Sequence, residues 1–128
     1  LNPGGVRIGT AEIYNTVEKL DEIVECLVIA QNWNSDVRIV LFLKLKSDFK
    51  LTQQLEEKVV NQIKKNLTPR HVPAKLIAVP DIPRTRSGKI TELAVRDIVH
   101  GKEIKNKEAL ANPEALSHFA NIPTLSKD

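Results

Sequence analysis

Two apolar runs separated by a short polar segment are the feature that most constrains the fold of this chain. Residues 23–30 and 37–45 are rich in Val, Ile, Leu and Phe, and residues 32–36 between them include two asparagines, a serine and an aspartate. Apolar runs of this length, bounded by turn-forming residues, are typical of two antiparallel strands joined by a turn. We expect Trp33, beside that turn, to have a packing role. The sequence therefore predicts a sheet that begins with a local strand pair.

Two predicted helices flank this strand pair. After Thr10, which we expect to cap a helix, apolar residues recur at Ile13, Val17 and Leu20, at spacings of four and three. Thr52 is expected to cap a longer helix with acidic residues early and basic residues late, an order that complements the helix dipole. The apolar line of that second helix is Leu55, Val59, Ile63 and Leu67.

A third strand and further helices complete the expected architecture. Residues 74–79 predict a strand that ends before Pro80, and residues 6–9 could form a short strand or hairpin arm. Thr91 is expected to open a third helix that ends at Gly101, and Pro113 to begin a last short one. Their apolar residues are Leu93, Val95, Ile98, Val99, Leu116 and Phe119. The predicted fold class is α+β, a small three-stranded, mostly antiparallel sheet with helices packed on it.

Composition narrows the class of protein. A chain of 128 residues, of which 41% are hydrophobic, can bury one core, and no apolar stretch is long enough to span a bilayer. The single cysteine, Cys26, lies in an apolar run, which favours a buried, inert thiol and a reducing, cytoplasmic location. The absence of methionine suggests a piece of a longer polypeptide. No histidines or cysteines stand at metal-ligand spacing; we expect His71, His100 and His118 to be surface or capping residues and no metal site.

Charge is concentrated in residues 64–89, which contain seven basic residues and one acidic residue. Such a segment is expected to face something negative. Only 4% of the residues are aromatic, so a stacking platform for nucleic acid is not visible, and a small polyanion fits better.

The lysine loop, residues 83–89, stands at the end of this basic segment. It combines Lys89 with Gly88, which lets the backbone turn sharply, and with Thr85 and Ser87, whose hydroxyls can pin the loop. Two arginines lie nearby. The combination suits a phosphate-bearing ligand, although a solvated basic turn remains the alternative for such a short string.

Two motifs give the chain a resemblance to the C-terminal domain of adenylate-forming enzymes, the group that includes acyl-CoA synthetases. The lysine loop resembles the family's Pro-x-Thr-x-Ser-Gly-Lys signature, and residues 5–13 resemble its Gly-x-Arg-Ile/Leu-x-x-x-Glu-Ile signature. The resemblance covers essentially the whole chain. Residues 112–116 and 122–125, together with Thr91 and Glu92, are similar to the acetoacetate-activating members, the acetoacetyl-CoA synthetases.

The resemblance implies two half-reactions. A carboxylate attacks the α-phosphate of ATP to give an acyl adenylate, and the thiol of coenzyme A then displaces AMP. The catalytic role implied for Lys89 is to offset the negative charge of the first step, with Ser87 and Gly88 beside it. The small domain then rotates and brings in Gly5, Arg7 and neighbouring Gly9, which the family places near coenzyme A, with Glu12 as an anchor.

The resemblance also implies parts that lie outside this chain. Residues 1–101 are expected to be a lid on a large N-terminal domain, and residues 102–128 a C-terminal extension with a short helix. The large domain would supply the acyl pocket and the Mg²⁺ site. By position, Lys64 matches an arginine that binds the 3′-phosphate of coenzyme A in a related synthetase, with a solvated helix end as the alternative. We do not expect the fragment alone to turn over.

Other interpretations remain open. The enzyme could act on acetate or propionate, because the acyl pocket is not in this sequence. The chain could instead be a non-enzymatic basic module that binds nucleotides, RNA or a partner protein through residues 64–89. In the resembling family the lysine is often acetylated, so Lys89 could be a target of a lysine acetyltransferase and deacetylase. Glu12 could simply be an acid favoured near a helix N-terminus.

Overall fold

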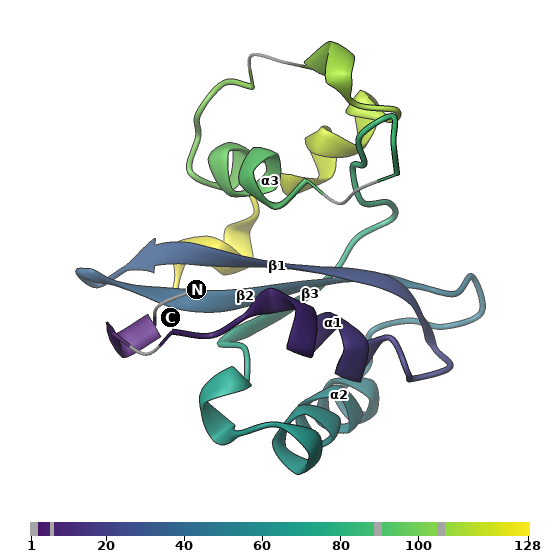
Figure 1. Ribbon diagram of the computed structural model, residues 1–128, viewed down its shortest axis with the longest axis vertical. Helices are drawn as coiled ribbons and strands as arrows, with labels where there is room; N and C mark the ends of the chain where they lie inside the picture. The colour runs from purple at the N-terminus through teal and green to yellow at the C-terminus, as the bar shows by residue number, and fades with distance from the viewer. Residues whose placement is uncertain (1–2, 6, 89–90, 105–106) are drawn as a thin grey trace.

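The structure is a computed structural model that describes residues 3–5, 7–88, 91–104 and 107–128. Its centre is a three-stranded sheet in the order β1 (Ile23–Trp33), β2 (Asp36–Leu45) and β3 (Lys75–Ala78). β1 is antiparallel to β2, and β3 is parallel to β2 over a shorter length. The predicted α+β fold with a mostly antiparallel sheet is confirmed. The sheet separates two layers of helices, as Figure 1 shows.

The predicted strand pair forms a long hairpin with a two-residue turn. Trp33 pairs with Asp36, and Asn34 and Ser35 between them have positive φ angles of 48° and 63°. Positive φ at both central residues matches the twist of an antiparallel pair, and asparagine tolerates it well. The Arg38 guanidinium lies 3.8 Å from the centroid of the Trp33 ring, so the expected packing role of Trp33 is confirmed.

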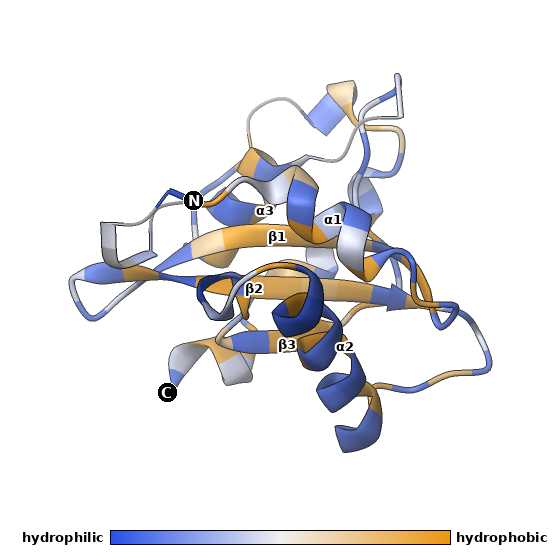
Figure 2. Cartoon of the chain, turned by 60° about the horizontal axis from the view of Figure 1, so that its bottom comes forward, coloured by the Kyte–Doolittle hydropathy of each residue, from blue (hydrophilic) through white to orange (hydrophobic). Residues whose placement is uncertain are grey.

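One layer contains α1 (Thr10–Val17) and α2 (Gln53–Asn66). The predicted cap of α2 is confirmed, because the backbone N–H of Leu55 donates to the Thr52 hydroxyl at 3.2 Å. After α2 the short 3₁₀ helix η2 (Pro69–His71) leads into β3, and this crossover through a helix makes β3 parallel to β2. Figure 2 shows the polar outer side of α2 and the hydrophobic strands beneath. Buried in this layer are Ile8, Ile13, Val17, Leu55, Val59 and Ile63.

The other layer contains α3 (Glu92–Val99) and the 3₁₀ helices η3 (Lys107–Ala109), η4 (Pro113–Phe119) and η5 (Pro123–Ser126). Phe119 packs edge-on against Phe42 of β2, with ring centroids 4.8 Å apart. The predicted anchors of the last short helix, Leu116 and Phe119, are both buried. Gly101 ends α3 with φ at +77°, as expected for a left-handed helix end.

Side chains from the helices occupy the outer edge of β1. The backbone N–H groups of Cys26, Val28 and Asn32 donate to Glu18, Tyr14 and His100, at 3.2, 3.0 and 3.0 Å. An edge strand with free N–H groups is open to pairing with another chain. These three side chains close much of that edge.

Several sequence predictions differ from the structure. Residues 7–9 lie in no strand; they follow the 3₁₀ helix η1 (Pro3–Gly5), which packs on β2, and residue 6 lies outside the described residues. Gly9, not Thr10, is the residue that precedes α1 as its cap. Leu93, placed on the apolar side of the third helix, is 65% exposed. In the part of the chain that the structure describes, no helix has the length and apolarity to cross a membrane.

Candidate functional site

The described part of the lysine loop is a tight hydrogen-bonded turn. The Gly88 N–H donates to the Thr85 carbonyl at 2.9 Å, and the hydroxyls of Thr85 and Ser87 are 2.9 Å apart. Gly88 has φ at +87°, and a Cβ added there would meet nothing within 4 Å. The glycine is therefore needed for its backbone conformation and not for space. Lys89 itself lies outside the described residues.

The C-terminal extension pairs with this loop. Thr85 and Leu110 form an antiparallel bridge, the Arg86 N–H donates to the Ala109 carbonyl at 3.2 Å, and the Ala111 N–H donates to the Arg84 carbonyl at 2.8 Å. A short two-stranded ribbon thus holds residues 84–86 in place. Ser87 and Gly88 extend beyond it and are exposed.

A charged cluster ties the start of the loop to the sheet. Glu25 of β1 is only 7% exposed and forms an ion pair with Arg84. Lys44 of β2 lies 3.1 Å from Asp81 and 4.0 Å from Glu25. A buried carboxylate without a partner would be costly, so Glu25 fixes Arg84. Arg84 therefore has a structural role in the fold, although the sequence suggested that it lies beside a ligand.

Asn112 completes this arrangement, which we call the anchor cluster: Glu25, Lys44, Asp81, Arg84 and Asn112. The Asn112 Oδ1 accepts from the Arg84 N–H at 2.8 Å, while its Nδ2 donates to Asp81 at 2.9 Å and to the Ile82 carbonyl at 3.0 Å. Burial alone would raise the pKa of Asp81, but the hydrogen bonds from Asn112 and Lys44 hold that pKa below its usual value.

Sequence reasoning did not identify the anchor cluster. One signal was present in the sequence: Glu25 is a charged residue inside an apolar strand, which indicates a buried partner. Its partner Arg84 is far away in sequence, and no periodicity or motif connects the two. Asn112 belongs to the stretch 112–116 that resembles the family, and this resemblance does not indicate its contacts with Asp81 and Arg84.

The glycine-arginine segment, residues 5–12, begins at η1 and ends in the first turn of α1. Gly5 has φ at +79°, and Arg7 is exposed. Gly9 has an extended backbone, with φ at −81° and ψ at 140°. The Glu12 carboxylate lies 2.9 Å from Nε2 of His71, whose Nδ1 lies 2.7 Å from the Thr68 hydroxyl. Glu12 thus links α1 to η2 and fixes the end of the segment.

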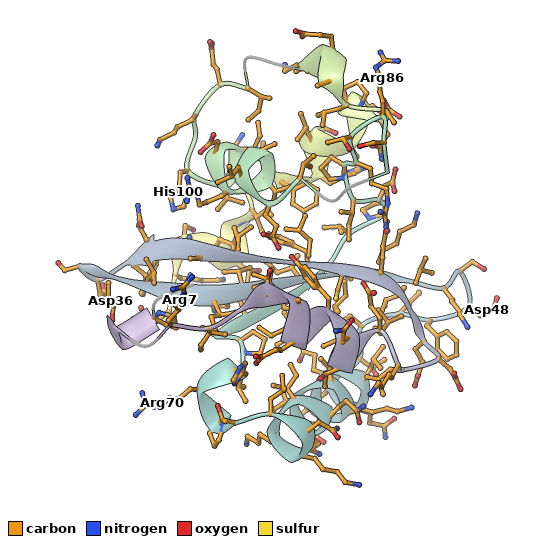
Figure 3. The ribbon with its side chains drawn as sticks, viewed as in Figure 1. Arg7, Asp36, Asp48, Arg70, Arg86 and His100 are labelled. Atoms are coloured by element: carbon orange, nitrogen blue, oxygen red, sulfur yellow. The ribbon has the colours of Figure 1, made fainter. Side chains whose placement is uncertain are left out.

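Among the described residues, the lysine loop and the glycine-arginine segment do not meet. Figure 3 shows Arg86 of the lysine loop at the top of the molecule, whereas Arg7 lies beside the sheet at its left. Ile8, next to Arg7, is buried in the layer of α1 and α2. Lys64 is exposed in the last turn of α2, in the same layer as the glycine-arginine segment. The basic stretch of residues 64–89 does not form one surface either, since Arg70 and Arg86 lie on opposite sides of the sheet.

The described residues contain neither a metal-binding cluster nor a reactive thiol. No group of three or more His, Cys, Asp or Glu within them could hold a metal ion. Cys26 is fully buried, and burial, together with the nearby Glu18 carboxylate, raises the pKa of its thiol. A thiol in that state is a poor nucleophile.

Comparisons with known proteins connect the chain to a family. The model of the AMP-binding enzyme C-terminal domain matches residues 12–89. Acetoacetyl-coenzyme A synthetase of Rhizobium meliloti (strain 1021) is 63% identical over 125 residues, which are 98% of this chain and 19% of that protein. Acetoacetyl-CoA synthetase of Caenorhabditis elegans is 45% identical over 121 residues, 93% of this chain and 17% of that protein. The chain thus spans about a fifth of the length of these curated relatives.

Solved structures agree with the sequence matches. Acetoacetyl-CoA synthetase from Streptomyces lividans superposes with a TM-score of 0.85 at 34% identity, covering 95% of this chain and 19% of that one. An acyl-CoA synthetase of Brucella canis gives a TM-score of 0.70 at 26% identity, covering 75% of this chain and 18% of that one. From the match over residues 12–89 and these superpositions, the chain belongs to the AMP-binding enzyme C-terminal domain family.

Proposed function

We propose that this chain is the catalytic lid of an AMP-forming acid–thiol ligase that joins acetoacetate to coenzyme A. In the first half-reaction, the acetoacetate carboxylate attacks the α-phosphorus of ATP; a mixed anhydride forms and pyrophosphate leaves. In the second, the thiol of coenzyme A attacks the acyl carbonyl; the thioester forms and AMP leaves. The relatives named acetoacetyl-CoA synthetase support this choice of acid.

One observation carries the proposal: the lysine loop and the glycine-arginine segment lie on opposite sides of one small sheet. A rigid domain of this shape can present only one of the two segments to a single active site at a time. A rotation of the lid between the half-reactions would present each segment in turn. The large domain on which the lid would turn is the proposed partner of this chain.

Lys89 is the proposed catalytic residue of the first half-reaction. Its ammonium group would neutralise charge where the carboxylate approaches the α-phosphate, and this interaction grows in the transition state. The hydrogen-bonded turn before it supports the role, because Thr85, Ser87 and Gly88 hold the chain that leads to the lysine. Acetylation of Lys89 by a lysine acetyltransferase would remove the charge, and a deacetylase would restore it.

The glycine-arginine segment is the proposed binding element of the second half-reaction. Gly5 and Gly9 offer open backbone along which the pantetheine arm of coenzyme A could lie, since a Cβ added at either would meet nothing within 4 Å. Arg7 is exposed and would face phosphate. Glu12, through its link to His71, would fix the direction of the segment.

The test uses the complete enzyme with Lys89→Ala and measures the half-reactions separately. We expect acetoacetate-dependent exchange of pyrophosphate into ATP to fall by about 100-fold or more, the range found when a stabilising group is lost from a transition state. Release of AMP from supplied acetoacetyl adenylate by coenzyme A should change little. Lys102→Ala, at an exposed lysine after α3, is the control and should alter neither step. Equal loss of both steps would refute the role of Lys89.

The assignment of Lys64 to the 3′-phosphate of coenzyme A has its own matched control. Lys64 and Lys65 are adjacent, exposed lysines in the last turn of α2. We expect Lys64→Ala to raise the KM for coenzyme A several-fold and to leave the KM for dephospho-coenzyme A unchanged. Lys65→Ala should change neither value. A similar effect of both variants would reduce the assignment to general surface charge.

Acid specificity, Mg²⁺ and location complete the proposal. Pyrophosphate exchange with acetoacetate, acetate and propionate would distinguish the proposed substrate from the alternatives. The large domain is the proposed holder of Mg²⁺, together with the phosphates of ATP. We place the enzyme in the cytoplasm, where a buried free cysteine is kept reduced.

A further inference from the structure

The C-terminal extension contacts the lysine loop at every described residue from Arg84 to Arg86. Its backbone pairs with the loop at Ala109, Leu110 and Ala111. The Arg86 side chain adds a bond, because its Nε donates to the Glu108 carbonyl at 2.9 Å. Residues 84–86 of the lysine loop are therefore one strand of a ribbon whose other strand is the extension.

Asn112 locks the end of this ribbon to the sheet. Both polar atoms of its side-chain amide form hydrogen bonds. The oxygen accepts from the Arg84 N–H, and the nitrogen donates to Asp81 and to the Ile82 carbonyl. These partners lie on either side of Pro83, which has no N–H of its own to hold the backbone. Asp81 in turn receives a hydrogen bond from Lys44 of β2 at 3.1 Å. A continuous chain of polar contacts thus runs from the sheet through Asn112 to the loop.

The share of this chain that is matched differs between the comparisons. The family model ends at residue 89, before the extension begins. The acetoacetyl-CoA synthetase of Streptomyces lividans covers 95% of the chain, which leaves too few unmatched residues to omit the extension. The Brucella canis acyl-CoA synthetase covers 75%.

We propose that Asn112 is a positioning residue for the adenylation half-reaction: it sets the place of the lysine loop and thereby of Lys89. The inference rests on the proposed function of Lys89 and adds the residue that positions the Lys89 side chain. A charge that stabilises a transition state must be held within a fraction of an ångström, and a displacement of about 1 Å can cost about 100-fold in rate. Release of the ribbon end would allow such a displacement without any loss of charge.

The first test is Asn112→Ala in the complete enzyme, with Ser117→Ala, an exposed residue of the same extension, as the control. We expect the kcat of acetoacetate-dependent pyrophosphate exchange to fall about 10- to 100-fold, with the KM for ATP within about threefold of wild type. Release of AMP from supplied acetoacetyl adenylate should stay within about threefold. Unchanged adenylation, or an equal loss in both half-reactions, would overturn the proposal.

A second pair of variants keeps the test decisive if the alanine variant folds poorly. Asn112→Asp retains the acceptor for the Arg84 N–H but places a second carboxylate against Asp81, so adenylation should fall. Adding Asp81→Asn restores an amide–carboxylate bond between the two positions in the opposite sense, and should recover much of the adenylation rate. A double variant no better than Asn112→Asp would contradict the positioning role.

The inference and the proposed function fail in different ways. If Lys89→Ala leaves adenylation intact, the proposed function is wrong whatever Asn112 does. If Lys89→Ala abolishes adenylation and Asn112→Ala does not affect it, the proposed function stands and the positioning role falls.

Discussion

The hydroxyl of Tyr14 donates a hydrogen bond to the carboxylate of Glu92 and so joins α1 to α3 across the edge of β1. The same hydroxyl accepts from the backbone N–H of Val28 at 3.0 Å. Burial, together with the Glu92 hydrogen bond, raises the pKa of Tyr14, so the phenol stays protonated and remains a donor. Since α1 follows the glycine-arginine segment and α3 follows the lysine loop, this contact connects the two layers that carry the proposed site segments.

Tyr14→Phe is expected to destabilise the chain by about 1–3 kcal/mol. The variant leaves the Glu92 carboxylate and the Val28 N–H without this partner, and loss of a hydrogen bond to a charged group has a cost in that range. Urea unfolding followed by Trp33 fluorescence, the only tryptophan in the sequence, measures the change. Asn15→Ala, on an exposed position of the same helix, is the control and should stay within about 0.5 kcal/mol. An equally small effect of Tyr14→Phe would show that the contact adds no stability.

The layers of the fold were predictable because local patterns specify them. The hairpin, the Thr52 cap, the buried line of α2 and the left-handed Gly101 follow from hydrophobic spacing and turn chemistry. Leu93 was not predictable in this way, because its apolarity matches the helix period while its side chain is 65% exposed. Likewise residues 7–9 alternate like a strand, with Ile8 buried between exposed neighbours, yet they lie in no strand.

The site was predictable only where a contiguous motif carries it. Ser87, Gly88 and the residues of the glycine-arginine segment could be named from sequence, and their roles stay predictions. The anchor cluster could not be named, because Glu25, Arg84 and Asn112 meet only after the sheet and the extension have folded. Long-range polar contacts of this kind leave no periodic trace in a single sequence.

Gly9→Ala should separate function from folding. The backbone of Gly9, at φ −81° and ψ 140°, is open to alanine, and the added Cβ would meet nothing within 4 Å. The loss of a favourable cap residue and the lower entropy of the unfolded chain act in opposite directions, so we expect stability to change by less than about 1 kcal/mol. In the complete enzyme, the methyl group would obstruct coenzyme A and slow thioester formation, while pyrophosphate exchange stays near wild type.

The control for Gly9→Ala is Gly101→Ala. Gly101 has φ at +77°, so alanine is strained there, by about 1–2 kcal/mol, at a position outside both proposed segments. Gly101→Ala should lower the free energy of unfolding and should not slow one half-reaction more than the other. If Gly9→Ala leaves both half-reactions at wild-type rates, coenzyme A does not pass along that backbone.

Cys26 is expected to report unfolding and to resist modification in the native state. Its side chain is fully buried, and the raised thiol pKa leaves little thiolate at neutral pH. Labelling with a chromogenic disulfide reagent should therefore be negligible without denaturant and should rise along the same urea curve as Trp33 fluorescence. Rapid stoichiometric labelling of the folded chain would mean that β1 opens locally.

Asp81 should make the stability of the chain depend on pH in acid. Its pKa is lowered in the folded state, against about 4 in an unfolded chain, so its stabilising contribution is present above that pH and is lost as the pH falls through the folded value. The free energy of unfolding of wild type should therefore exceed that of Asp81→Asn by more at pH 7 than at pH 3. Because Asn112 donates to the carboxylate, Asn112→Ala should raise the Asp81 pKa, which a carboxyl NMR titration can follow. A gap between wild type and Asp81→Asn that is the same at both pH values would show that the carboxylate charge does not stabilise the anchor cluster.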